Sequence, residues 1–154
     1  MQKILLPLFL TVIALPAPCQ QPRVTEIKDI PDYVLYDSFF FRVSWLEELA
    51  DNTRSRGEDD SSVRSTIQRQ AGLTLDEAAS LKRIVRDWKA RTSALKTAAQ
   101  SGGVKSVPEE HRQIMTELIG ELKAALPAKT FAQLDAFVHA SSTAKMIHVT
   151  PPAK

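Results

Sequence analysis

Hydrophobic residues recur with helical spacing along most of this chain. Between residues 32 and 56 the apolar positions are three or four apart, so they share one face of a helix. Pro31 stands where a helix begins, and Gly57 stands where one ends. The pattern therefore predicts a first helix from about Asp32 to Arg56. Its apolar stripe consists of Leu35, Phe39, Val43, Leu46 and Ala50.

Capping residues mark the next two helices. A thin apolar edge predicts a weak helix over about residues 62–70. Thr74 and Glu77 have the spacing of a capping box, which predicts the start of a third helix that continues to about residue 100. The apolar residues of this helix repeat with the spacing of a coiled-coil seam: Leu81, Val85, Trp88, Thr92, Leu95 and Ala99.

A fourth helix is predicted after Ser106, which repeats the capping pattern with Glu109. Pro127 ends it and opens a fifth helix over about residues 128–140. The short link between the third and fourth helices predicts an antiparallel hairpin, and no segment is a convincing strand. The sequence therefore predicts an all-α fold, a single-domain bundle of about five helices over residues 31–140 that contains a long antiparallel helical hairpin.

Residues 1–19 have the organisation of a secretory signal peptide. Lys3 supplies the positive start, an apolar run follows, and cleavage fits best after Cys19. The run is shorter than the roughly 20 apolar residues that a membrane-spanning helix needs. We expect a periplasmic or secreted mature chain without stable membrane insertion. Residues 20–30 are expected to form a flexible lead-in, and residues 141–154 a flexible tail.

Cys19 is the only cysteine, and two outcomes are open for it. In bacterial lipoproteins a cysteine becomes the first mature residue and carries the lipid. Such signals have a small residue just before the cysteine and an aliphatic residue two places earlier, where this chain has Pro18 and Pro16. The alternative is that Cys19 leaves with the signal peptide. Disulfides, thiol catalysis and cysteine-based metal binding are then excluded together.

The remaining chemistry-bearing residues form no catalytic or metal-binding motif. His111, His139 and His148 lack the spacing of a helical zinc site. The paired carboxylates are neighbours in sequence, and neighbours on a helix point about 100° apart, so they do not converge on one bond. Neither a glycine-rich phosphate loop nor a nucleophile elbow is present. We therefore expect a protein that is not an enzyme and that holds no cofactor and no metal.

Charge is nearly balanced, with 20 Lys and Arg against 18 Asp and Glu. Nucleic acid is not an expected partner, because proteins that bind it usually carry a larger basic excess. The basic residues of the third helix nevertheless follow a ribbon beside the apolar seam. Such a ribbon could hold an acidic or unfolded protein chain, or it could be an ordinary solvated helix face. The candidate client-binding residues are Lys82, Arg83, Arg86, Lys89 and Lys96.

Six of the ten aromatic residues lie in the predicted first helix. Its apolar residues surround more of the helix than a single stripe requires, which leaves two interpretations. The aromatic residues either pack in the core or form a surface for a partner or a second copy, since large exposed apolar patches usually contact something. The candidate partner-contact residues are Phe40, Phe41 and Trp45.

The sequence LTLDE over residues 73–77 resembles the Leu-Thr-x-x-Gln motif of the Spy/CpxP group of periplasmic helical proteins. The resemblance covers the signal peptide, this motif, and the long helix and hairpin that follow. Glu77 stands where the motif has glutamine, and Pro127 stands where a second copy would have threonine. The resemblance implies an exported all-α protein without a cofactor that pairs into a cradle-shaped dimer and holds unfolded or envelope-stress clients.

Two functional hypotheses follow from the sequence. The first is an exported helical binding protein, of periplasmic chaperone or envelope-stress type, that holds unfolded or acidic protein clients. The alternative is a structural or adaptor protein that docks onto a partner, or associates as a homodimer, through its aromatic first helix.

Overall fold

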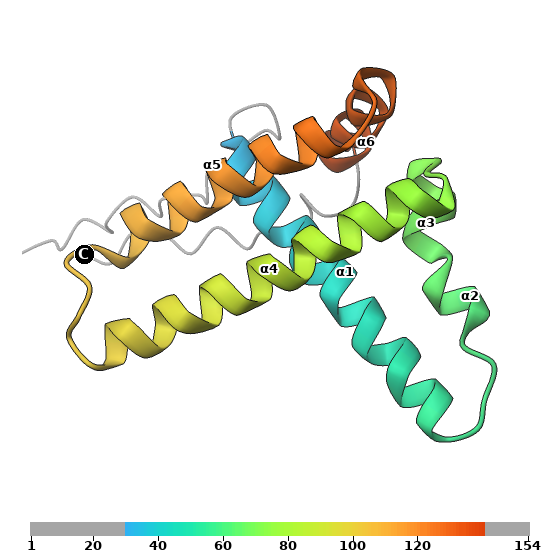
Figure 1. Ribbon diagram of the computed structural model, residues 1–154, viewed down its shortest axis with the longest axis horizontal. Coiled ribbons are helices and arrows are strands. Elements are labelled where there is room, and N and C mark those ends of the chain that lie inside the picture. Colours follow the sequence, from blue (N-terminus) through green and yellow to red (C-terminus); the bar gives the residue numbers. More distant parts are fainter. Residues whose placement is uncertain (1–29, 141–154) are drawn as a thin grey trace, which may run out of the picture.

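Every regular element in the computed structural model, which describes residues 30–140, is a helix (Figure 1). The predicted all-α fold with its helical hairpin is therefore confirmed. The expected signal peptide with Cys19, the expected tail and nearly all of the expected lead-in lie outside the described residues. The helices are α1 (Asp32–Ser55), α2 (Ser61–Arg64), α3 (Thr66–Ala71), α4 (Leu75–Gln100), α5 (Val107–Ala125) and α6 (Ala128–Ala140).

One predicted helix is divided in the structure. The weak helix expected over residues 62–70 consists of α2 and α3, which are separated by Ser65. The Ser65 hydroxyl donates to the carbonyl oxygen of Ser61 at 2.9 Å, and the Thr66 hydroxyl donates to that of Ser62 at 2.8 Å. Such side-chain bonds to backbone carbonyls compete with the helical ladder and bend it.

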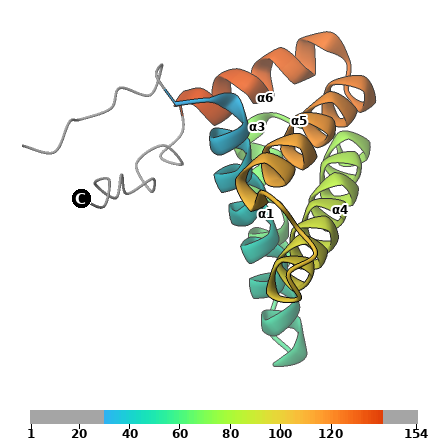
Figure 2. The same cartoon turned by 90° about the vertical axis from the view of Figure 1, so that its left-hand side faces the viewer.

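Helices α4 and α5 lie side by side as the antiparallel hairpin, and α1 crosses this pair (Figure 1). From the end of α5 the chain turns into α6, which contacts α1, and Figure 2 shows these four helices from the side. Helices α2 and α3 return the chain from the end of α1 to the start of α4. Helix α1 therefore contacts both helices of the hairpin and also α6.

The core forms where the apolar faces of these helices meet. From α1 it receives Tyr36 and Phe40 in addition to most of the predicted stripe. Each fully buried large apolar side chain contributes about 1.5–3 kcal/mol to folding, so packing of this kind can hold the fold without disulfides. The largest fully buried side chains are Leu35, Tyr36, Phe39, Phe40, Val43, Leu81, Ile84, Val85, Met115, Leu118, Leu122 and Leu134.

The predicted capping box at the start of α4 is present. The Thr74 hydroxyl oxygen accepts from the Glu77 amide at 3.3 Å, and the Glu77 carboxylate accepts from the Thr74 amide at 2.8 Å. Glu77 also accepts from the Thr130 hydroxyl of α6 at 2.7 Å. These bonds, that from the Thr74 amide above all, lower the pKa of Glu77. The cap therefore also joins α4 to α6.

The second predicted cap does not form. Ser106 precedes α5, but its side chain makes no capping hydrogen bond. The start of α5 instead has Pro108 in the first turn, together with Glu109 and Glu110. Proline tolerates the unpaired donors of a first turn, and negative charge is favourable at the positive end of the helix dipole.

Candidate functional site

An exposed aromatic pair lies on α1. Phe41 is 62% exposed and Trp45 is 52% exposed. They are four residues apart, so they are neighbours on the helix surface. The other large exposed hydrophobic residues among the described part of the chain, Leu75 and Val107, stand singly at helix starts. We call Phe41 and Trp45 the aromatic face.

Phe40 does not belong to this surface, although the sequence placed it with Phe41 and Trp45. It is 0% exposed and packs edge-on against Trp88 of α4, with ring centroids 6.3 Å apart. Consecutive residues point about 100° apart on a helix, so the same sequence run supplies both a core residue and a surface residue. Phe40 is a core residue, and the accessible part of the predicted set is the aromatic face.

Two of the five candidate basic residues are engaged in ion pairs with α1. Lys82 Nζ lies 3.0 Å from Glu47 Oε1, and Lys89 pairs with Glu48. Both lysines therefore lie along the edge of α4 that faces α1. Their charge is compensated inside the molecule, which leaves them less available to an acidic partner than the sequence suggested.

The other three basic residues, Arg83, Arg86 and Lys96, are exposed on α4. The Arg86 guanidinium donates to the carbonyl oxygen of Lys82 at 3.4 Å. Within residues 30–140 none of the three forms an ion pair. These residues supply the uncompensated positive charge of the ribbon.

The structure brings the aromatic face and the basic ribbon next to each other. Trp45 precedes Glu48 by three residues and is its neighbour on α1, and Glu48 pairs with Lys89 of α4. Arg86 in turn precedes Lys89 by three residues on α4. The two sets, which are about 40 residues apart in sequence, therefore meet where α1 crosses α4 (Figure 1). Lys89 links the two sets through its pair with Glu48, and we call Phe41, Trp45, Arg86 and Lys96 the contact surface.

Arg91 holds the opposite edge of α4 to α5. Its guanidinium lies 2.9 Å from Asp87, 2.9 Å from Glu117 and 3.2 Å from Glu121. The hydrogen bond with Asp87 is the main reason that the pKa of Arg91 is raised. Arg91 therefore serves the hairpin and not the contact surface.

The two described histidines join helices. His111 Nε2 lies 3.1 Å from Asp37 Oδ1, which also accepts from the indole nitrogen of Trp88 at 2.8 Å. Asp37 thereby connects α1 with both helices of the hairpin. His139 of α6 lies 3.3 Å from Asp32 at the start of α1. Sequence spacing had excluded a zinc motif but gave no sign of these contacts.

Metal-ligating side chains do not gather into a site in the described part of the chain. Residues 30–140 contain no group of three or more His, Cys, Asp or Glu that could hold a metal ion.

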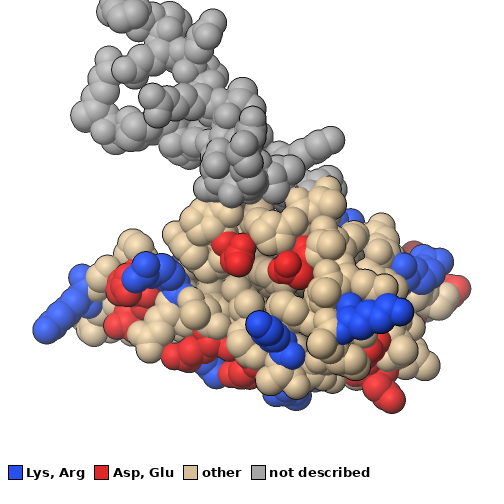
Figure 3. Space-filling view, turned by 90° about the horizontal axis from the view of Figure 1, so that it is seen from above, with Lys and Arg blue, Asp and Glu red and all other residues tan. Residues whose placement is uncertain are grey.

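Acidic and basic side chains are interspersed on the face seen from above in Figure 3. An open groove of about 700 Å³ lies between Tyr33 and α5, where Arg112 already pairs with Glu109 at 2.7 Å. Among the described helices none is both long and apolar enough to cross a membrane.

Comparison of the chain with protein-family models, curated protein sequences and solved structures gives no match. The resemblance to the Spy/CpxP group therefore stays a prediction from the motif at residues 73–77.

Proposed function

We propose that the protein is an exported, non-enzymatic binding protein that holds segments of other proteins on its contact surface, as a periplasmic chaperone or envelope-stress factor would. The observation that carries this proposal is the exposed pair Phe41 and Trp45 beside the basic residues of α4. Aromatic residues and arginine are enriched at protein interfaces, where a few such residues supply most of the binding energy.

The two kinds of residue would contribute differently. Phe41 and Trp45 offer large apolar areas whose burial against a client slows dissociation. The uncompensated charges of Arg86 and Lys96 attract acidic segments and raise the rate of encounter. Clients that combine apolar and acidic residues, and that expose them because they are unfolded, fit this surface. No cofactor, metal or nucleic acid is needed for such a role.

Export is the second part of the proposal, and it rests on the signal-peptide pattern of residues 1–19. The mature protein would work in the periplasm or outside the cell. An adenosine triphosphate-driven cycle is not required, because the surface binds by contact alone. Cell fractionation of the full-length chain tests this part: recovery of an uncleaved product in the cytosol would contradict it.

An aggregation-suppression assay tests the binding part. A chemically unfolded client is diluted into buffer with equimolar protein, and light scattering is followed. We expect suppression by the wild type and its loss in the double variant Phe41→Ser/Trp45→Ser, since truncated interface aromatics commonly cost about 2 kcal/mol or more each. Arg86→Glu/Lys96→Glu should weaken suppression of acidic clients selectively.

Leu75→Ser is the matched control, because Leu75 is a still more exposed hydrophobic residue, 76% exposed, but stands alone. It should suppress aggregation as the wild type does. Absence of suppression by the wild type, or equal suppression by the double variant Phe41→Ser/Trp45→Ser, would contradict the proposal.

The aromatic face also supports a second function, that of an adaptor that docks onto a folded partner or onto a second copy through α1. Exposure of Phe41 and Trp45 is the specific observation in its favour. Sedimentation velocity distinguishes self-association: a dimer that becomes a monomer in the double variant supports it, and a monomer at all concentrations removes the homodimer.

A further inference from the structure

The segment between α1 and α4 is bounded by two glycines in the left-handed region. Gly57 has φ of 75°, and Gly72 has φ of 66°. Residues 58–71 lie between them and contain α2, α3 and the interruption at Ser65. We call residues 58–71 the strap. Because glycine tolerates both signs of φ, these two positions are where the backbone can turn at least cost.

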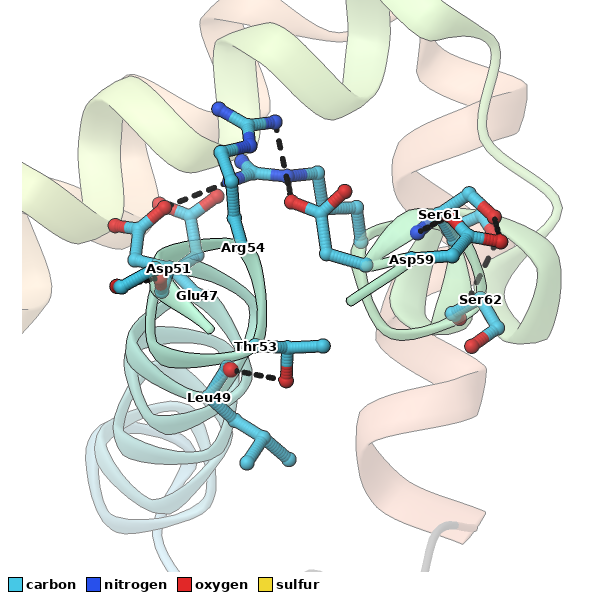
Figure 4. Close-up of polar contacts among 12 residues, drawn as sticks. Glu47, Leu49, Asp51, Thr53, Arg54, Asp59, Ser61 and Ser62 are labelled. Carbon is cyan, nitrogen blue, oxygen red and sulfur yellow. Dashed lines mark hydrogen bonds and ion pairs between the residues drawn. The ribbon is translucent and has the colours of Figure 1, made fainter. Parts of the chain in front are cut away.

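Much of what fastens the start of the strap to α1 is ionic. Arg64 Nη2 lies 2.7 Å from Asp51 Oδ1 of α1, and Arg54 Nη2 of α1 lies 3.1 Å from Asp60 Oδ2. Arg64 also pairs with Asp60 inside the strap. Figure 4 shows the end of α1, with Asp51 and Arg54, facing the turn that begins the strap. Asp51 and Arg54 are exposed whereas Arg64 and Asp60 are partly buried, so each tie to α1 has one exposed partner and is partly screened by salt.

Apolar fastening of the strap is sparse. Helix α2 has no buried residue, and α3 buries only Ile67 and Ala71. By contrast, α4 buries five residues over its first 14 positions. A stretch with few buried apolar contacts and partly exposed ionic ties belongs to the low-stability end of a protein.

The packing beneath the strap is incomplete. A cavity of about 20 Å³ lies there, lined by Val43 and Leu46 of α1, Val63 and Ile67 of the strap, and the Glu47–Lys82 pair. Unfilled space removes dispersion contacts, so the strap gains less from covering this surface than a close-packed segment would. Lifting the strap would uncover Val43 and Leu46 on the same helix that carries Trp45.

We propose that residues 58–71 open locally as one unit, hinged at Gly57 and Gly72, and that opening uncovers the apolar surface of Val43 and Leu46. The open fraction rises with ionic strength, because each tie to α1, at Asp51 and at Asp60, has one exposed partner and is partly screened by salt. The opened surface would extend the apolar area offered to a client, and this consequence rests on the proposed function. The opening itself needs no client.

Hydrogen exchange measured by mass spectrometry on the full chain tests the opening. At about 0.05 M NaCl, Arg64→Gln should speed exchange of the amides in 61–71 by up to about tenfold, because it removes both the tie to Asp51 and the pair with Asp60. In about 1 M NaCl the wild type should approach the variant, since the Debye length is then only about 3 Å. Amides of α4 should not change, and binding of an apolar dye should rise together with the exchange rate.

Two further variants keep the test specific. Asp51→Asn removes the ion pair between Asp51 of α1 and Arg64, and it should accelerate exchange of the same amides less than Arg64→Gln does. Arg112→Gln is the matched control, because it removes an exposed pair with Glu109 inside α5 and should leave the strap unchanged. The proposal is overturned if the strap amides exchange at the same rate as those of α4, or if their exchange responds neither to salt nor to Arg64→Gln. Faster exchange of the strap amides without more dye binding would also overturn it.

The exchange measurement separates this proposal from the proposed function. If the strap opens but the wild type suppresses no client aggregation, the local opening stands and the proposed function fails. If the protein suppresses client aggregation but the amides of 61–71 exchange only together with those of α4, the proposed function stands and the proposal that the strap opens locally fails.

Discussion

The two halves of α1 are held in different ways. In the first half, Leu35, Tyr36, Phe39 and Phe40 are all 0% exposed and contact the hairpin or α6. In the second half, beyond Val43, only the small side chains of Ala50 and Thr53 are buried, and ion pairs with α4 and with the strap supply much of the contact. Helix α1 is therefore held by apolar packing in its first half and largely by ion pairs in its second half.

The two faces of α1 explain where a binding surface can lie. A side chain on the buried face of the first half is committed to the core, as Phe40 is through its contact with Trp88. The opposite face of α1 leaves the large side chains of Phe41 and Trp45 at the surface without losing the fold, because the buried face anchors the helix. Trp45 lies at the crossing with α4, just before Glu47 and Glu48, which pair with α4, and the strap lies beyond it.

The largest effect is expected from Phe40. Phe40→Ala should lower the free energy of unfolding by about 3–5 kcal/mol, because it leaves a cavity in the rigid half of α1. Phe41→Ala changes the neighbouring residue, which is 62% exposed, and should cost less than about 1 kcal/mol. Urea unfolding followed by circular dichroism measures both. Equal losses would show that the buried and the exposed face of the first half of α1 do not differ as described.

A smaller effect concerns Tyr36, whose hydroxyl donates to Asp135 of α6 at 2.8 Å. Burial, followed by the interaction with Asp135, raises the pKa of Tyr36 above its ordinary value. A raised pKa in the folded state means that this contribution is complete below about pH 10 and is lost as the pH rises further. Tyr36→Phe should cost about 1 kcal/mol at neutral pH.

The pH dependence of the free energy of unfolding at alkaline pH supplies the control for this prediction. Stability of the wild type should fall more steeply above about pH 10 than that of Tyr36→Phe. Parallel curves for the two proteins, measured by urea unfolding across this range, would show that Tyr36 does not link α1 to α6 in a protonation-dependent way.

The smallest effect is expected in the strap at acid pH. The hydrogen bond from Arg64 lowers the pKa of Asp60, whose other cationic neighbour is Arg54 of α1. A lowered pKa means that the tie contributes fully above the ordinary pKa of aspartate, near 4, and is lost as the pH falls below that value through the lowered pKa of Asp60. Exchange protection of 61–71, corrected for intrinsic rates, should fall as the pH drops from about 4.5 to about 2, before that of α4 does.

Asp60→Asn provides the comparison for the acid prediction. It should lower strap protection already at about pH 6 and reduce the further change on acidification. Asp59 remains in this variant and bonds only within the strap, to Ser61. A strap whose protection follows α4 at every pH would contradict the contrast between the two regions.

Local pattern was enough to predict most of the fold. The apolar periodicity and Pro127 predicted α6 over 128–140, and the capping box at Thr74 predicted the start of α4. Both patterns depend on residues only a few positions apart, so they can be recognised in the sequence. The absence of a cap bond at Ser106 shows the limit of such a pattern, since the hydroxyl must also point at the right amide.

The candidate surface was less predictable for a physical reason. Phe40 and Phe41 are adjacent in sequence, and only the direction from which α4 crosses α1 decides which of them is buried. The pairs of Lys82 and Lys89 with Glu47 and Glu48 depend on that same crossing. Helical spacing assigns residues to a face, but it does not say which distant element covers the face.

Site-specific photocrosslinking to a defined unfolded client tests the central claim most directly. A photoreactive phenylalanine analogue in place of Phe41 should capture the client, whereas the same analogue in place of Leu75 should capture little, although Leu75 is the more exposed side chain. Equal capture at the two positions, or none at position 41 while the protein still suppresses aggregation, would contradict the account of α1 as the contact helix.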